Sequence, residues 1–180
     1  TNAYKGITGM WLAKNDYTPI ESVVSGGTFV FNTSKLTSFS FFAPDVNFDN
    51  ITISGGAKVS SLRPDDMKYN GAVVNGVPVV ADVHVIKNLT INGNSTLNCG
   101  MDELYVGRNF SVASGCTLTI NNDKNVYFDG QLSGTYNSAV TIPNLYLKKT
   151  KAAAKVTVAS GSSMKVSGKV YANLGLVAGS

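Results

Sequence analysis

The acidic residues are the side chains of this sequence that could cleave a sugar polymer. Enzymes that hydrolyse glycosidic bonds use two carboxyl groups, one as the acid and one as the base or nucleophile. The 180-residue chain holds only 11 Asp and Glu, and the candidates are Asp65-Asp66, Asp102-Glu103, Asp123 and Asp129. Asp102 and Asp123 align one repeat apart at a turn, where aspartate commonly serves the bend itself. We therefore assign no catalytic residue and expect that the protein is not an enzyme.

The sequence also has few residues that could bind a metal or carry out thiol chemistry. His84 is the only histidine, and Cys99 and Cys116 form no Cys-x-x-Cys motif, so we expect no metal site and no cofactor. In the repeat described below, Cys99 aligns with Ile120 and points inward. Cys116 aligns with Ser95, which lies about 13 Å along the strand from Cys99. A disulfide needs Cα atoms within about 7 Å, so we predict two unpaired thiols.

An aromatic or histidine side chain recurs at one position of a short string. Each string reads apolar, ring, apolar, and successive strings begin about 21, 22, 19 and 25 residues apart. Alternation along a strand sends the middle side chain outward. The five ring residues are His84, Tyr105, Tyr127, Tyr146 and Tyr171. Three interpretations stay open for this row: stabilisation of the sheet by stacking, packing of subunits, and contact with a glycan.

These strings belong to a repeat of about 22 residues that holds three short strands. The second strand type begins with Asn and reads Asn, apolar, Ser or Thr, apolar at residues 50–53, 88–91 and 109–112. The third follows six residues after the last apolar residue of the second, with Gly at 55, 93, 115 and 161 in the bend. Stacked Asn side chains at the start of the second strand can hydrogen-bond from one repeat to the next.

Short strands of this kind bury an apolar face only by stacking on copies of themselves. The sequence therefore predicts an all-β fold, a parallel β-helix (β-solenoid) with three short strands and about 22 residues per turn. We expect it to be right-handed, because 22 residues exceed the roughly 18 of three hexapeptides and parallel crossovers are usually right-handed. The alternative is a β-sandwich with turns every 8–12 residues.

Residues 1–35 do not fit the repeat. Thr18-Pro19-Ile20-Glu21 has the pattern of a helix start, with Thr as the N-cap and Pro at the first helical position. We expect residues 1–35 to form a cap with a short helix over 19–24, and residues 36–180 to form the β-helix. The last repeat stops at residues 174–180 without a polar cap, which predicts end-to-end or lateral self-association into a homo-oligomer.

Residues 60–82 interrupt the repeat. Asn75-Gly76 between two apolar runs predicts a hairpin, so this insertion is expected to be a loop plus hairpin. Insertions of solenoids often carry binding residues. The candidates here are Arg63, Asp65, Asp66 and Asn75.

The composition limits the partners. The net charge is +4, but the basic residues form no dense stripe with recognition elements, so we expect no nucleic acid partner. No apolar run approaches the roughly 20 residues of a membrane helix, so no membrane span is expected. A polysaccharide or glycan remains a candidate ligand.

Several strings resemble the turns of pectate-lyase-like parallel β-helices. They are Val126-Tyr-Phe, Asn109-Phe-Ser-Val and Ser114-Gly-Cys-Thr-Leu-Thr-Ile. The class includes phage tail fibres and tailspikes and bacterial adhesins, and the resemblance covers about residues 46–176. It implies a cell-surface, extracellular or virion location and an oligomer, often a trimer.

We therefore expect a non-catalytic extracellular structural or attachment protein, a self-associating subunit of a virion fibre or a cell-surface filament. The alternative is a carbohydrate-active enzyme (a polysaccharide lyase or glycoside hydrolase) or a glycan-binding module.

Overall fold

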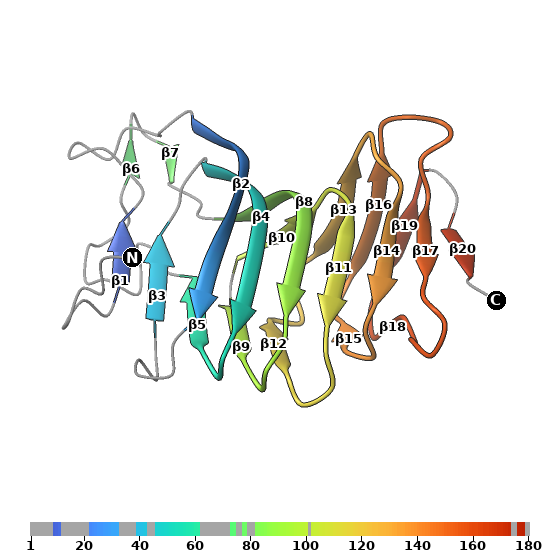
Figure 1. The fold of residues 1–180 in the computed structure, drawn as a ribbon. Helices are drawn as coiled ribbons and strands as arrows, with labels where there is room; N and C mark the ends of the chain where they lie inside the picture. The colour runs from blue at the N-terminus through green and yellow to red at the C-terminus, as the bar shows by residue number, and fades with distance from the viewer. Residues whose placement is uncertain are drawn as a thin grey trace.

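The computed structural model describes residues 9–11, 22–32, 39–42, 46–61, 73–74, 77–78, 82–100, 102–173 and 176–178. Within these ranges the chain is all-β, without a helix, and its parallel strands stack into a β-solenoid of about 5 turns with about 22 residues per turn (Figure 1). The predicted fold class and repeat length are therefore confirmed.

Three stacks of strands run along the solenoid, one for each predicted strand type. In the first sheet, the opening residues of β8 (Val83–Ile91) pair with β10 (Leu104–Val106), and β13 (Val126–Gly130), β16 (Leu145–Lys149) and β19 (Val170–Ala172) follow. In the second sheet, the closing residues of β8 pair with β11 (Asn109–Val112), and β14 (Gly134–Asn137), β17 (Val156–Val158) and β20 (Leu176–Ala178) follow. The strand β4 (Val46–Ser54) pairs with both parts of β8.

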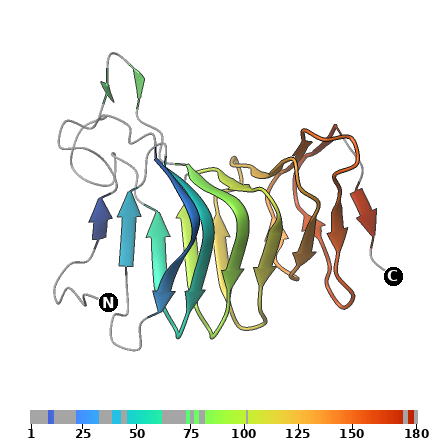
Figure 2. The ribbon, with the colours of Figure 1, turned by 45° about the horizontal axis from the view of Figure 1, so that its top comes forward.

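The third sheet holds β1 (Gly9–Trp11), β3 (Phe39–Phe42), β5 (Lys58–Ser61), β9 (Thr96–Gly100) and β12 (Thr117–Ile120) in this order. The later turns contribute the separate parallel pair β15 (Thr141–Ile142) and β18 (Lys165–Val166). Figure 2 shows that the strands lie side by side, one turn after another, along the length of the solenoid. Every turn therefore returns the chain to the same three positions.

The core is the column of apolar side chains that alternation sends inward. Val85, Val106, Phe128 and Leu147 occupy equivalent positions of successive turns, and each is at most 2% exposed. The bends between the second and third sheets use the four predicted glycines, whose φ angles are +66° at 55, +62° at 93, +80° at 115 and +77° at 161. Glycine adopts this left-handed backbone without steric cost, which explains its recurrence there.

An asparagine ladder joins three turns at the start of the second sheet. The Asn88 Nδ2 group donates to Asn50 Oδ1 at 2.7 Å, and Asn109 Nδ2 donates to Asn88 Oδ1 at 2.7 Å. The ladder continues at both ends, because Asn50 Nδ2 donates to the Gly27 carbonyl at 3.0 Å and Asn109 Oδ1 accepts from the Thr135 amide. The predicted hydrogen bonding of stacked Asn side chains is confirmed.

The segment 1–35, for which the sequence predicts a cap, contains two strands in the part that the structure describes. The strand β2 (Ser22–Asn32) pairs in parallel with β4, and β1 pairs in parallel with β3, so both belong to the turns themselves. The helix expected over 19–24 is wrong at residues 22–24, which are strand, and residues 19–21 lie outside the described ranges. The valines of Ser-Val-Val gain backbone partners on β4, and that pairing outweighs the helix-start signal at Thr18.

The insertion contains the hairpin that Asn75-Gly76 predicts. The short strands β6 (Val73–Val74) and β7 (Val77–Pro78) are antiparallel, and Figure 2 shows them to one side of the stacked turns. The four candidate binding residues of the insertion, Arg63, Asp65, Asp66 and Asn75, lie outside the described residues.

Both cysteines are free thiols, as predicted, and Cys99 is buried. The predicted alignment of Cys99 with Ile120 is wrong by one residue. A register shift between Thr119 and Ile120 pairs Ile120 with Gly100, whose φ of +49° marks the irregularity. A local bulge of this kind leaves no trace in the apolar pattern, because Cys99 still points into the core.

Candidate functional site

The five predicted ring residues form one continuous stack on the first sheet, which we call the aromatic ladder. Backbone register pairs His84 with Tyr105, Tyr105 with Tyr127, Tyr127 with Tyr146, and Tyr146 with Tyr171. The distances between successive ring centroids are 4.1, 4.2, 4.9 and 4.3 Å. The sequence prediction of an ordered row is therefore correct in both members and order.

The ladder presents ring edges to solvent, because its ring faces cover one another. The planes of His84 and Tyr105 differ by 7° and those of Tyr105 and Tyr127 by 3°. Only 8% of Tyr127 is exposed, whereas 44% of Tyr171, the last ring, is exposed. A sugar ring binds an aromatic residue by stacking on its face. The inner rings offer no such face, so the row lacks the geometry of an aromatic sugar platform.

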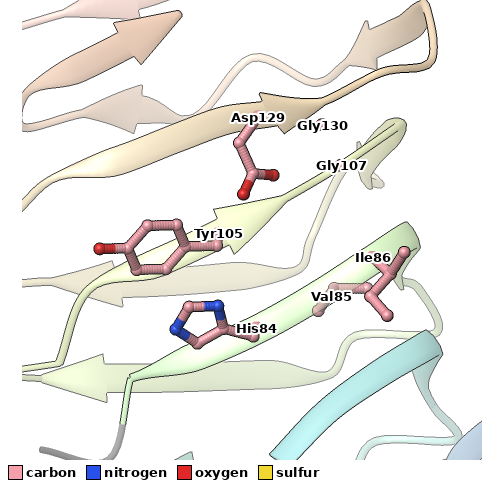
Figure 3. Close-up of a pocket in the computed structure, with 7 residues that line it drawn as sticks. All are labelled: His84, Val85, Ile86, Tyr105, Gly107, Asp129 and Gly130. Carbon is pink, nitrogen blue, oxygen red and sulfur yellow. The ribbon is translucent and has the colours of Figure 1, made fainter. Parts of the chain in front are cut away.

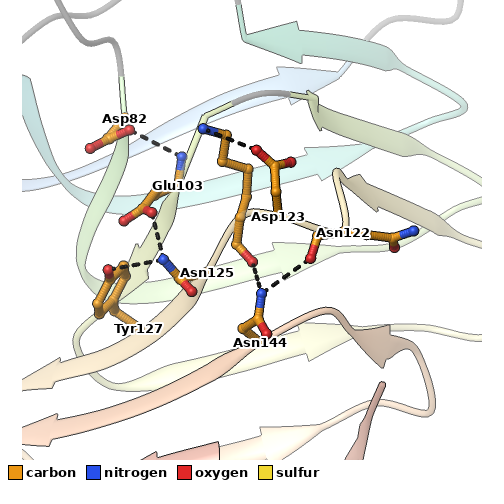
Figure 4. Close-up of polar contacts among 8 residues, drawn as sticks. Asp82, Glu103, Asn122, Asp123, Asn125, Tyr127 and Asn144 are labelled. Carbon is orange, nitrogen blue, oxygen red and sulfur yellow. Dashed lines mark hydrogen bonds and ion pairs between the residues drawn. The ribbon is translucent and has the colours of Figure 1, made fainter. Parts of the chain in front are cut away.

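A polar row runs beside the ladder, one residue before each ladder string: Asp82, Glu103, Asn125, Asn144 and Lys169. Figure 4 shows its hydrogen bonds. Asp82 Oδ1 accepts from the Glu103 amide at 3.0 Å, and Glu103 Oε1 accepts from Asn125 Nδ2 at 2.6 Å. Asn144 Nδ2 donates to the Lys124 carbonyl at 2.9 Å. These polar side chains join neighbouring turns to one another.

The polar row also binds the ladder hydroxyls. Tyr105 donates its hydroxyl to Glu103 Oε2 at 3.2 Å, and the Tyr127 hydroxyl accepts from Asn125 Nδ2 at 3.2 Å. Burial, and next the neighbouring Tyr127 and Glu103, raise the pKa of Tyr105 well above its usual range. Burial, with help from Glu103, raises the pKa of Tyr127 to about 12. Both hydroxyls therefore stay protonated near neutral pH.

A small pocket of about 110 Å³ opens beside His84 at one edge of the ladder (Figure 3). Its wall includes Tyr105, Gly107 and Asp129. Burial raises the pKa of Asp129, although the charge of His84 and of Lys149 opposes this effect. The pocket places one carboxylate beside one imidazole and holds no second carboxylate.

Lys149 lies beneath this pocket and is 2% exposed. Its ammonium group donates to the Gly107 carbonyl at 2.7 Å and to the Asp129 carbonyl at 2.5 Å. Burial lowers the pKa of Lys149, and Asp129 opposes that shift. The burial of Lys149 was not predicted. A period-two signal for it exists, since Leu145, Leu147 and Lys149 alternate on the inward face of β16.

Of the other candidate carboxylates, Asp65 and Asp66 lie outside the described residues, and Asp102 and Asp123 make separate contacts. Asp102 is 1% exposed and accepts a hydrogen bond from the Ser61 hydroxyl at 2.6 Å. The Asp123 side chain is 70% exposed and lies 3.6 Å from Lys124 Nζ. Backbone register pairs Ile120 with Gly100 before the turn and Val126 with Leu104 after it, so the later turn is two residues longer than the earlier one. The predicted alignment of Asp102 with Asp123 falls inside these unequal turns and stays a prediction.

Three further features bear on function: groups of metal-binding side chains, membrane-spanning helices and similarity to known proteins. No three side chains of His, Cys, Asp or Glu come together in the ranges that the structure describes. No helix in those ranges has the length and apolar character of a membrane-spanning segment. Comparisons of the chain with models of protein families, with curated proteins and with solved structures each found no match.

Proposed function

We propose that the protein is a non-catalytic structural or attachment protein, a β-solenoid subunit of a virion fibre or a cell-surface filament that works outside the cell. The observation that carries this proposal is the aromatic ladder, whose rings join each turn to the next through three stacked contacts and one contact tilted by 35°. The asparagine ladder joins the turns in the same way. Such continuous ladders favour a stiff rod, which suits a fibre or an attachment stem.

The placement of the carboxylates supports a non-catalytic role. Asp49 lies 2.8 Å from Lys87 Nζ, Asp102 binds Ser61, and Glu103 binds Asn125. Each of these acidic side chains is engaged in contacts that join turns of the solenoid. A hydrolase needs two carboxyl groups that face one bond, at about 5 Å or about 6.5–9.5 Å from each other, and these three are dispersed among separate contacts.

Self-association is the second part of the proposal. Within the residues that the structure describes, β19 pairs along one edge only, with β16, and it carries Val170 and Tyr171, which are 55% and 44% exposed. An edge strand that carries exposed apolar side chains is a surface for pairing with another chain. A second copy that pairs along β19 would cover both side chains and continue the aromatic ladder.

Two measurements test the proposal on the 180-residue chain. Sedimentation velocity and electron microscopy over a range of concentrations report its assembly, and we expect filaments or discrete oligomers. Reducing-sugar and unsaturated-product assays on acidic and neutral polysaccharides report turnover, and we expect none. A monodisperse monomer at high concentration would contradict self-association, and turnover that disappears in Asp129→Asn would favour the carbohydrate-active alternative.

A further inference from the structure

Charge is distributed unevenly along the solenoid axis. All 11 acidic residues lie at or before Asp129, and no Asp or Glu follows it in the sequence. Six lysines follow it: Lys148, Lys149, Lys151, Lys155, Lys165 and Lys169. The net charge of +4 is therefore carried by the last turns, whereas the part of the chain up to residue 130 has a small excess of acidic residues.

Four of these lysines form a cationic surface on the first sheet and the turn that leaves it: Lys148, Lys151, Lys155 and Lys169, all exposed. Lys148 Nζ lies 4.8 Å from the centroid of the Tyr127 ring and 5.8 Å from that of Tyr146, so the aromatic ladder holds its charge above the sheet. Lys151 and Lys155 flank the turn after β16, and Lys169 directly precedes β19. Lys149 is buried and does not contribute.

The spacing of these charges follows from the register. Leu145 pairs with Val170, so Lys169 lies one turn beyond Lys148 and four residues before it along the strand direction. This places their Cα atoms about 13 Å apart along the strand and about 5 Å apart across it. Asp129 pairs directly with Lys148, whereas Asp82 and Glu103, the carboxylates in the same row as Lys169, lie on earlier turns. The surface therefore has an excess of positive charge spread over an extended strip.

We propose that this cationic surface binds an acidic polysaccharide, which would be the attachment target of the protein and so rests on the attachment part of the proposed function. An extended polyanion can contact lysines that are about 13 Å apart, because each contact releases its own counterions. Proteins that bind single-stranded nucleic acid stack its bases on exposed aromatic faces. Stacked rings of the ladder, such as Tyr105 on Tyr127, cover one another's faces, so the ladder favours a polysaccharide over a single-stranded nucleic acid.

The test measures binding of the 180-residue chain to heparin (sulfated), polygalacturonate (carboxylated), dextran (neutral) and a 20-base-pair DNA duplex at several salt concentrations. We expect binding to both acidic polysaccharides and none to dextran. The affinity should fall with salt with a logarithmic slope of about −3, from about −0.7 for each of four lysines. The variant Lys148→Ala/Lys151→Ala should lose about tenfold in affinity.

The matched control is Lys58→Ala/Lys165→Ala, which removes the same charge from exposed lysines of β5 and β18, away from the first sheet. It should change the affinity less than about twofold, and circular dichroism should show that both variants stay folded. Equal losses in the two variants, no loss in either, or tighter binding of the DNA duplex than of heparin at the same salt would overturn the proposal. A monomer that binds acidic polysaccharide would support this inference and contradict self-association. Filaments that bind no acidic polysaccharide would support self-association and contradict this inference.

Discussion

Replacement of Tyr127 by Ala tests whether the aromatic ladder is a scaffold. Tyr127 is 8% exposed and stacks on Tyr105 at 4.2 Å and on Tyr146 at 4.9 Å. Truncation of a buried aromatic side chain to Ala costs about 3–5 kcal/mol. The polar edge of this ring faces Asn125, so we expect the lower half of that range, about 3–4 kcal/mol. For a chain of this size, that is a fall of about 10 °C in Tm.

The same substitution at Tyr171 is the internal comparison. Tyr171 is 44% exposed and stacks on one neighbour, Tyr146, at 4.3 Å. One exposed stacking contact is worth about 1 kcal/mol, so Tyr171→Ala should cost about that much. Tyr127→Phe keeps the ring and loses the contacts of its hydroxyl edge, among them the 3.2 Å hydrogen bond from Asn125, which should cost about 1 kcal/mol or less.

Urea unfolding followed by circular dichroism measures the three variants, and hydrogen exchange locates the loss among the turns. The expected order of destabilisation is Tyr127→Ala, then Tyr171→Ala, then Tyr127→Phe. If Tyr127→Ala costs no more than Tyr171→Ala, the rings are not coupled through their faces. The ladder would then be a surface feature available to a ligand, and the structural interpretation of its inner rings would be refuted.

Three further substitutions test the polar contacts. Asn88→Ala removes two hydrogen bonds of the asparagine ladder and should cost about 2 kcal/mol in urea unfolding. Asn92→Ala changes an exposed Asn outside that ladder and should cost less than about 0.5 kcal/mol. Equal costs would contradict a stabilising role of the asparagine ladder. Lys149→Met leaves the Gly107 and Asp129 carbonyls without their donor and should cost about 2–3 kcal/mol by the same assay, and a neutral result would show that the buried ammonium group is dispensable. Burial raises the pKa of Asp129, so the folded state binds this proton more tightly and stability falls as pH rises through the folded pKa. Asp129→Asn should therefore be more stable than the original chain at pH 7 and lose that advantage below about pH 4, the unfolded pKa; an advantage that grows at low pH would contradict the assignment.

The sequence predicted the parts of the fold that repeat. The spacing of the ladder strings identified all five ring residues. Gly93 and Gly115 marked the bends, because the backbone there has a positive φ angle, which glycine adopts readily. The strands β1 and β2 were not predicted, because the segments that contain them lack a ladder string and the pattern at Thr18-Pro19 favours a helix. Pairing with an adjacent strand, which a local pattern does not report, decided the structure there.

The functional part was predicted less completely, for a physical reason. Period two indicates that Tyr105 and Tyr127 point outward, but it does not report that their planes lie within 3° of each other and cover one another. That angle removes the stacking surface on which a glycan interpretation of the inner rings depends. The burial of Lys149 could have been predicted from the alternation in β16, whereas its carbonyl partners on two earlier turns depend on the register of three strands.

Steric constraints indicate where a partner is recognised. A Cβ atom at Gly107 would overlap the Ile86 carbonyl, and one at Gly134 would overlap the Arg108 carbonyl, so successive turns are too close there for any side chain. The inward positions and the ladder are constrained in the same sense, by packing and by ring stacking. The outward positions beside the ladder are held by side-chain hydrogen bonds instead of close packing, and there the residues change from Asp82 and Glu103 in earlier turns to Lys169 in the last. A partner that contacts this side of the solenoid therefore meets a charge that changes sign along the axis, and an acidic polymer should bind the last turns with the earlier turns directed away from it.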